Sequence, residues 1–219
     1  IVGIAGISGN GQNALMALLS GERLAPAGSI RLDGSPIGVL GPRGRRALGL
    51  RYVPEERLGH GAVPELSLAE NTLLTIDGLR SRGIVRPAAA AACAARVMRR
   101  FDVHCAGVKA RAASLSGGNL QKFLVGREVL AEPGVLLVNQ PTWGVDVGAS
   151  AAIRNALIAL RARGCAILVV SEEIDELFEL ADRLMVMAAQ RLSPAVAAHS
   201  LPVEELGRWM AGRWPRVGR

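Results

Sequence analysis

Short apolar segments alternate along the chain with longer segments whose apolar positions recur at helical spacing. This alternation predicts an α/β fold with a mostly parallel sheet. Residues 135–138 are apolar throughout, as expected for a strand that is buried on both faces. Strands are predicted at residues 1–5, 28–34, 48–53, 135–138, 165–170 and 183–187, the last of these being the final strand.

Helices are predicted between these strands. Ser67 and Glu70 have the spacing of a capping box, so a helix is expected to begin there. The alanine-rich segment 88–101 favours a helix by intrinsic propensity. Residues 83–87 are expected to interrupt the chain, and the segment after Gln190 is expected to be looser. The other helices are predicted at residues 14–21, 117–131, 147–163, 174–181 and 203–211.

The net charge of +7 raises the question of a nucleic-acid partner. Lys109 and Lys122 are the only lysines, and the arginines are scattered along the chain. Aromatic residues, which stack on single-stranded bases, make up only 3% of the sequence. No nucleic-acid partner is therefore expected, although a basic face suits an anionic membrane surface.

The cysteines and the start of the chain indicate the kind of compartment and the kind of chain. Cys93, Cys105 and Cys165 are widely spaced, which favours a reduced compartment over a disulfide framework or a zinc site. No apolar run approaches the roughly 18 residues of a membrane span. The chain opens on a strand pattern, with neither an initiator Met nor a signal peptide. We expect it to be a piece of a longer polypeptide.

Residues 6–13 read GISGNGQN and lie between a predicted strand and a predicted helix, the context of a phosphate-binding loop. Three glycines match the pattern GxxGxGK(S/T): Gly6, Gly9 and Gly11. Gln12 and Asn13 stand where that pattern has Lys and Ser/Thr. Taken alone, the glycines fit an ordinary tight turn equally well.

A second candidate phosphate contact lies in LSGGNLQK, residues 115–122. Ser116 is followed by Gly117 and Gly118 at the start of a predicted helix. Backbone N–H groups can face an anion there with no side chain in the way, at the positive end of the helix dipole.

Four signals now occur in one order: the glycine loop, the SGG helix start, an apolar strand followed by Asn139-Gln140, and a strand ending in Ser171-Glu172. Together they resemble the nucleotide-binding domain of ABC transporters. LSGGNLQK resembles the signature motif, GISGNGQN Walker A, VLLVNQPT Walker B, GVD the D-loop, VVSEE the switch-histidine segment and YVPE the Q-loop.

The resemblance implies a P-loop NTPase (RecA-like) core with an ABC-type α-helical subdomain. It places the first part of the core, with Walker A and the Q-loop, at 1–57 and the helical subdomain, ending in the signature, at 58–122. The second part of the core, with Walker B, the D-loop and the switch segment, is placed at 123–190, and a tail with a short helix at 191–219.

A narrower resemblance rests on GNGQ, YVPEERLGHG, SLAENTLL, QPTWGVDVGA and SEEIDEL. These segments look like the second, C-terminal ATP-binding domain of importers for simple sugars and nucleosides, which is degenerate and fused to a first such domain. The expected partners are that first domain, transmembrane permease subunits and, indirectly, a substrate-binding protein. The expected location is the cytoplasmic face of the bacterial inner membrane.

The family's catalytic groups are replaced at five positions. Working sites have a Lys and a Ser/Thr in the loop, an Asp and a Glu after the Walker B strand, and a His on the next strand. The residues here are Gln12, Asn13, Asn139, Gln140 and Glu172. The resemblance therefore implies ATP as ligand, no competent catalytic residue in this site, and Mg²⁺ at the partner's site rather than at this one.

The signature keeps its residues. In the family it completes the ATP site of the opposite domain, and the resemblance carries that role in trans to Ser116, Gly117, Gly118 and Gln121. Asp146 is placed at the dimer interface, with a turn-forming Asp as the alternative. The residues expected near the chain's own nucleotide are Gly6, Gly9, Asn10, Gly11, Gln12, Asn13 and Glu55.

Three other functions stay open. The chain fits a stand-alone ATPase with unusual residues, or a scaffold that binds no nucleotide. It also fits a non-transport ABC protein that acts on nucleic acid or ribosomes, although SEEIDEL and QPTWGVD argue against this. No metal site is expected at His60, His104 or His199, and Trp143 is assigned packing or interfacial contacts only.

Overall fold

The computed structural model describes residues 1–81 and 84–215. The chain divides into two compact units, each assembled from segments that are distant in the sequence. Gly83, where the predicted interruption at 83–87 begins, lies outside the described residues. Unit 1 comprises Ile1–Arg51, Val135–Gln140 and Ala166–Arg219, and unit 2 comprises Tyr52–Gly134 and Pro141–Cys165.

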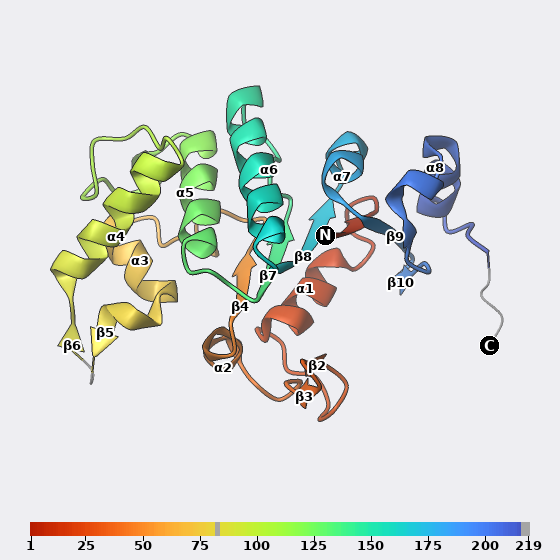
Figure 1. Cartoon of the computed structure of the whole chain (residues 1–219), viewed down its shortest axis with the longest axis horizontal. Coiled ribbons are helices and arrows are strands. Elements are labelled where there is room, and N and C mark those ends of the chain that lie inside the picture. The colour runs from red at the N-terminus through yellow and green to blue at the C-terminus, as the bar shows by residue number, and fades with distance from the viewer. Residues whose placement is uncertain (82–83, 216–219) are drawn as a thin grey trace. The chain divides into compact units, whose positions relative to one another are not determined.

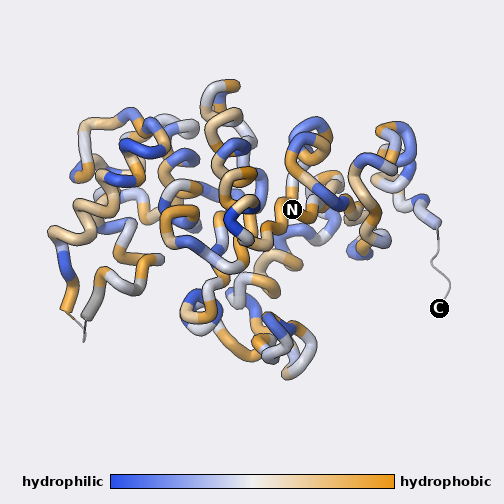
Figure 2. Tube along the Cα trace, in the orientation of Figure 1, coloured by the Kyte–Doolittle hydropathy of each residue, from blue (hydrophilic) through white to orange (hydrophobic). Residues whose placement is uncertain are grey.

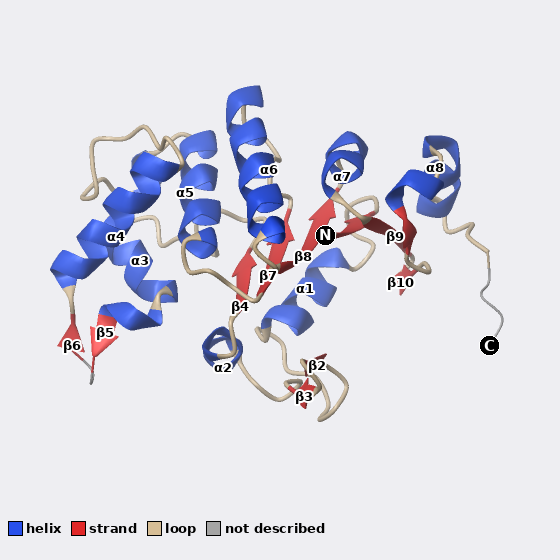
Figure 3. Cartoon of the chain, viewed as in Figure 1, coloured by secondary structure: helices blue, strands red, loops and turns tan. Residues whose placement is uncertain are grey.

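Unit 1 is built on a sheet with the strand order β10-β9-β1-β8-β7-β4 (Figure 1 and Figure 3). The pairs β9-β1, β1-β8 and β8-β7 are all parallel, which confirms the predicted α/β fold. Strand β4, Leu50–Val53, carries the chain from unit 1 into unit 2. The parallel strands are β1 Val2–Ala5, β7 Val135–Asn139, β8 Ala166–Ser171 and β9 Arg183–Ala188.

The parallel strands bury their apolar side chains, as the continuous hydrophobic runs predicted. Ile4, Val138 and Val169 are almost completely buried. The hydropathy of β7 and β8 is high along the strands, whereas the helices carry both polar and apolar residues (Figure 2). Parallel strands with helical crossovers place their carboxyl ends along one edge, where α/β proteins bind ligands.

The helices of unit 1 agree with most of the predictions. Helix α1 packs on β7, α7 packs on β1 and β8, and α8 packs on β9. Gly21 is the C-cap of helix α1, and α8 buries Leu206 and Trp209. The sequence did not predict the short helix α2. The bounds are α1 Gln12–Ser20, α2 Pro42–Ala47, α7 Ile174–Leu180 and α8 Val203–Met210.

Two strand predictions are wrong. Strand β9 is not the last, because β10 (Arg191–Leu192) and β11 (Val196–Ala197) follow it and pair with it in antiparallel fashion. The single strand predicted at 28–34 is a hairpin of β2 (Arg31–Leu32) and β3 (Ser35–Pro36). Strands of two residues are too short to show a period of two, so tertiary pairing rather than sequence pattern determines them.

Unit 2 is mainly helical. Its helices pack in succession, α3 on α4, α4 on α5 and α5 on α6. Residues 80–81 and 84–85 form a small antiparallel hairpin, β5-β6. The capping box is confirmed, because Ser67 Oγ accepts from the backbone N–H of Glu70 and the Glu70 carboxylate accepts from the Ser67 N–H. The helices are α3 Leu68–Thr75, α4 Pro87–Arg100, α5 Gly117–Val129 and α6 Val147–Ala162.

A buried ion pair lies in helix α5. The guanidinium of Arg127 donates to Glu128 Oε1 at 2.7 Å, and both side chains are 2% exposed. Arg127 also donates to the backbone carbonyls of Asn71 at 3.2 Å and Gly61 at 3.0 Å. One cation therefore joins helix α5, helix α3 and the loop that follows β4.

No helix in the two described ranges combines the length and the hydrophobicity that a membrane span requires.

Candidate nucleotide site

The glycine loop joins β1, which ends at Ala5, to α1, which begins at Gln12. Gly11 stands at the N-cap with φ of 109°, a left-handed conformation that residues with a side chain rarely adopt. No side chain caps this end of α1, so the N–H groups of its first turn are available to an anion. The local geometry is that of a phosphate cradle.

The two amide side chains of the loop turn back onto the loop itself. Asn10 Nδ2 and Gln12 Nε2 each donate to the carbonyl oxygen of Ile7 at 2.9 Å. Gln12 is buried at the position that the resemblance assigns to the phosphate-binding Lys. An uncharged donor that is already engaged with Ile7 offers a phosphate much less than an ammonium group does.

Asn10 also ties the loop to the turn between β9 and β10. Its Oδ1 accepts from the N–H of Ala189 at 2.7 Å, and its carbonyl accepts from Gln190 at 3.1 Å. Both turn residues have positive φ, 48° and 59°. This contact could not be predicted from the sequence, because the two segments are 179 residues apart.

Asn13 and Asn139 form a direct pair. Asn139 Nδ2 donates to Asn13 Oδ1 at 2.7 Å across 126 residues of sequence. In the family these positions hold a hydroxyl and a carboxylate that bind Mg²⁺. Magnesium prefers anionic oxygen ligands, and here two neutral amides satisfy each other. The pair of Asn13 and Asn139 therefore does not fit the metal.

The two remaining substituted positions also lie in unit 1. Gln140 follows β7 with φ of 52°, and its Oε1 accepts from the backbone N–H of Glu172 at 3.2 Å. An amide cannot take a proton from water as a carboxylate can. Glu172 is half-buried and brings a negative charge where the family has His. The structure thus gathers all five substituted positions in one unit: Gln12, Asn13, Asn139, Gln140 and Glu172.

Restoring metal ligands to the amide pair should create a response to Mg²⁺. With ATP present, we expect the thermal midpoint of the natural chain to be the same in Mg²⁺ and in EDTA. The double variant Asn13→Ser/Asn139→Asp should melt higher in Mg²⁺, since ATP at 100 times its Kd stabilises by about 2.7 kcal/mol. Asn155→Asp, an exposed change on α6, is the control for added charge. If the natural chain itself melts at a higher temperature with Mg²⁺ and ATP than with EDTA and ATP, the conclusion that its own site does not fit Mg²⁺ is wrong.

The signature motif lies in unit 2 and opens α5. Ser116 is the N-cap, and its Oγ accepts from the backbone N–H of Asn119 at 3.4 Å and from Asn119 Nδ2 at 2.9 Å. Ser116 and Gly117 are exposed, and Gly118 is half-buried. The hydroxyl keeps its own hydrogen for another acceptor, so the turn can cap its helix and still donate to an anion.

Asp146 caps the neighbouring helix α6. Its Oδ1 accepts from the N–H of Ala149 at 2.8 Å, and this hydrogen bond is the main reason that its pKa lies below the usual value. Asp146 is thus the N-cap of α6, and its role at a dimer interface stays a prediction. A Cβ added at Gly118 would lie 3.1 Å from Asp146 Oδ2, so a carboxylate borders the signature turn.

Two other predicted site residues also lie in unit 2. Gln121 is completely buried, donates to the carbonyl of Pro141 at 2.9 Å and accepts from Arg57 Nε at 3.2 Å. It supports the turn from within its own unit, and its action in trans stays a prediction. Glu55 is half-buried in the loop after β4. The neighbouring Arg57 carried no predicted role, because one more arginine in an arginine-rich chain gives no signal.

The remaining candidates form no further site. His60 packs edge-on against Tyr52 with ring centroids 5.8 Å apart, and His104 Nε2 lies 2.9 Å from Asp102 Oδ2. In residues 1–81 and 84–215, no three His, Cys, Asp or Glu side chains are grouped for a metal ion. Trp143 is exposed.

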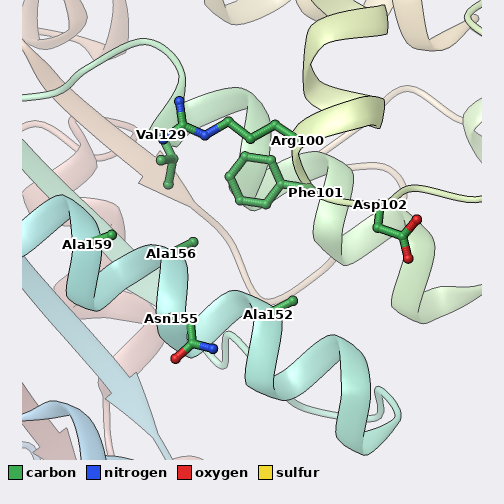
Figure 4. Close-up of a pocket in the computed structure, with 8 residues that line it drawn as sticks. All are labelled: Arg100, Phe101, Asp102, Val129, Ala152, Asn155, Ala156 and Ala159. Atoms are coloured by element: carbon green, nitrogen blue, oxygen red, sulfur yellow. The ribbon is translucent and has the colours of Figure 1, made fainter.

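A hollow of about 350 Å³ lies elsewhere in unit 2 (Figure 4). Its walls come from the end of α4, from α5 and from one face of α6. None of the residues predicted to bind nucleotide lines it. The lining residues are Arg100, Phe101, Asp102, Val129, Ala152, Asn155, Ala156 and Ala159.

Curated relatives match nearly the whole chain. It is 38% identical over 208 residues to the xylose import ATP-binding protein XylG of Burkholderia ambifaria, covering 94% of this chain and 40% of that protein. It is also 38% identical over 215 residues to the nucleoside import ATP-binding protein NupA of Lactococcus lactis subsp. cremoris, covering 97% and 42%. The chain thus spans less than half the length of these relatives.

Solved structures share the fold. The chain superposes with a TM-score of 0.76 and 18% identity on a dimeric ATP-binding cassette in a post-hydrolysis state bound to ADP and Pi, covering 90% of this chain and 85% of that one. A nucleotide-free ATP-binding cassette from an ABC transporter gives a TM-score of 0.72 and 19% identity, covering 96% and 84%. At the level of sequence, residues 1–143 match the family described as ABC transporter. The chain therefore belongs to the ABC transporter family, as a P-loop NTPase cassette with a mostly parallel sheet and an added helical part.

Proposed function

We propose that this chain is the second, degenerate ATP-binding domain of an importer for simple sugars or nucleosides. The observation that carries the proposal is the pair of Asn13 and Asn139, which puts two mutually satisfied amides where a working site holds its metal ligands. The relatives named for xylose and nucleoside import support the class of transporter, and their greater length leaves room for a first domain.

The chain's own site is proposed to bind ATP weakly and to hydrolyse it poorly. The glycine loop keeps the shape of a phosphate cradle, but Gln12 is engaged with Ile7 and brings no charge. Removing one preorganised electrostatic contact commonly costs ~10²–10³ in rate. Five positions differ here, and although their effects need not add, each acts on charge or proton transfer.

The signature is proposed to act on ATP held by the first domain. Ser116 and Gly117 are exposed at the start of a helix of 13 residues, with a hydroxyl and backbone N–H groups open to an anion. The result is an asymmetric pair with one competent site, whose ATP and Mg²⁺ are held mainly by the partner domain. The D-loop residue Asp146 would border that site, and Glu55 would link the nucleotide state to the helical part.

The remaining partners follow from the same proposal. The helical part would contact transmembrane permease subunits at the cytoplasmic face of the bacterial inner membrane, and a substrate-binding protein would deliver the cargo. The boundaries at residues 57, 122 and 190 stay a prediction for how core and helical subdomain alternate. Cargo specificity would reside in the subunits that contact the cargo.

An ATPase assay tests this proposal. The purified chain alone is expected to hydrolyse ATP at background rate. When it is assembled with a partner domain that carries an intact Walker A Lys and Walker B Glu, it is expected to raise the partner's rate of hydrolysis. Circular dichroism of the purified chain controls for folding. Robust turnover by the chain alone, or no effect of the chain on the partner's rate, would overturn the proposal.

A further inference from the structure

Arg57 lies directly against the signature turn. It follows β4 in the segment Pro54-Glu55-Glu56-Arg57, which the sequence marks only as a charged cluster. A Cβ added at Gly117 would lie 2.7 Å from Arg57 Nη1, and one added at Gly144 would lie 3.7 Å from Nη2. The guanidinium therefore lies beside the first residue of α5, and a side chain at position 117 would push it aside.

Two hydrogen bonds hold the guanidinium in place. Arg57 Nε donates to Gln121 Oε1 at 3.2 Å, and Nη2 donates to the carbonyl oxygen of Trp143. Gln121 is itself fixed, because it is completely buried and donates to the carbonyl of Pro141. A guanidinium has five N–H donors, and within the described residues Nη1 donates to no acceptor. The cation is thus preorganised and keeps unused donors beside Gly117.

A negative charge beside the signature turn is the reason that a phosphate would need this cation. The carboxylate of Asp146 lies close to Gly118, and its hydrogen bond from the Ala149 N–H lowers its pKa below the usual value. A phosphate that approached the turn would meet this negative charge, and the partial positive charge of a helix terminus only partly offsets it. Partial burial lowers the pKa of Arg57 below its usual value, yet arginine remains protonated in proteins.

We propose that Arg57 is a phosphate-contacting residue of the signature, which binds the terminal phosphates of ATP on the partner domain together with Ser116 and the backbone N–H groups of Gly117 and Gly118. The proposal rests on the proposed function, because it assumes that the signature acts in trans. Arginine suits this role, since its planar donors can form paired, charge-assisted hydrogen bonds with phosphate oxygens.

The competing role for Arg57 is a structural clamp between Gln121 and Trp143. The two roles differ in how a variant that keeps the positive charge and a variant that removes it should affect activity. Arg57→Lys keeps the positive charge but cannot form both clamp hydrogen bonds in the same geometry. Arg57→Met keeps much of the length and removes charge and hydrogen bonds alike.

The test measures kcat and KM for ATP in the assembled transporter, together with the urea midpoint of each variant. We expect Arg57→Met to lower kcat/KM by about 10- to 100-fold, as for the loss of a hydrogen bond to a charged group, and Arg57→Lys by at most a few fold. Arg99→Met, an exposed change in the last turn of α4, is the matched control and should leave both parameters unchanged.

Each result decides the question. If both Arg57 variants lose activity equally and their urea midpoints are lowered by the same amount, the residue is a clamp and the proposal is wrong. If neither variant changes kcat/KM while Ser116→Asp abolishes turnover, the signature acts in trans without Arg57. If Ser116→Asp has no effect either, the proposed function itself fails.

Discussion

Replacing Ser116 by Asp is expected to lower ATP turnover of the assembled transporter by ~10²–10³-fold, the usual cost of losing a preorganised contact to developing charge. Asp is as good an N-cap as Ser, so α5 should remain intact. The new carboxylate would repel the phosphate that the hydroxyl is proposed to contact. Ser116→Arg should lower turnover as well, because its large side chain would block the approach of the phosphate. Turnover is measured with saturating Mg²⁺–ATP.

The matched control for Ser116 is Ser200→Asp. Ser200 is also exposed and also near a helical turn, where its Oγ donates to the carbonyl of Ala197 at 2.8 Å. It lies in unit 1 and has no proposed contact with nucleotide, so turnover should not change. Unchanged turnover in both Ser116 variants would show that the signature does not act on the partner's ATP.

Replacing Arg127 by Met is expected to lower the free energy of unfolding by about 3–5 kcal/mol, because it leaves the buried carboxylate of Glu128 without a partner. The carbonyls of Asn71 and Gly61 would lose their donors as well. Urea denaturation measures the loss. The double variant Arg127→Met/Glu128→Gln should regain part of it, since no unpaired charge remains.

Arg100→Met is the control for Arg127, because Arg100 is exposed at the end of α4 and its loss should change stability by less than about 0.5 kcal/mol. An Arg127→Met variant as stable as the natural chain would show that the buried pair contributes nothing net. If the double variant is no more stable than the single one, the contacts to Asn71 and Gly61 carry the effect instead.

The sequence predicted a helix or strand correctly where the residues that indicate it lie within that same element. The capping box at Ser67 and Glu70 was predicted from spacing alone, and the structure confirms the helix that it begins. The glycines before Gln12 indicated a tight turn, and their place between a predicted strand and a predicted helix agrees with the structure. The apolar run at 135–138 predicted a buried parallel strand for the same reason. Such signals lie within a few residues of each other, so tertiary contacts are not needed to detect them.

The contacts that define the candidate site were not predictable in the same way. The substitutions at Asn13 and Asn139 were visible in the sequence, but their hydrogen bond joins residues 126 positions apart. The position of Arg57 over Gly117 depends on how the loop after β4 folds against α5. A single sequence specifies which groups are present, whereas their pairing depends on the packing of the whole unit.

The division of the chain into two units bears on how such a site is lost and how it could be regained. All five substituted positions belong to unit 1, whereas the signature residues belong to unit 2. Substitutions at these five positions therefore change the charges of one unit and leave the signature residues of the other unchanged. By the same reasoning, an engineer who wished to rebuild a catalytic centre would graft five side chains into the sheet unit and leave the helical unit as it stands.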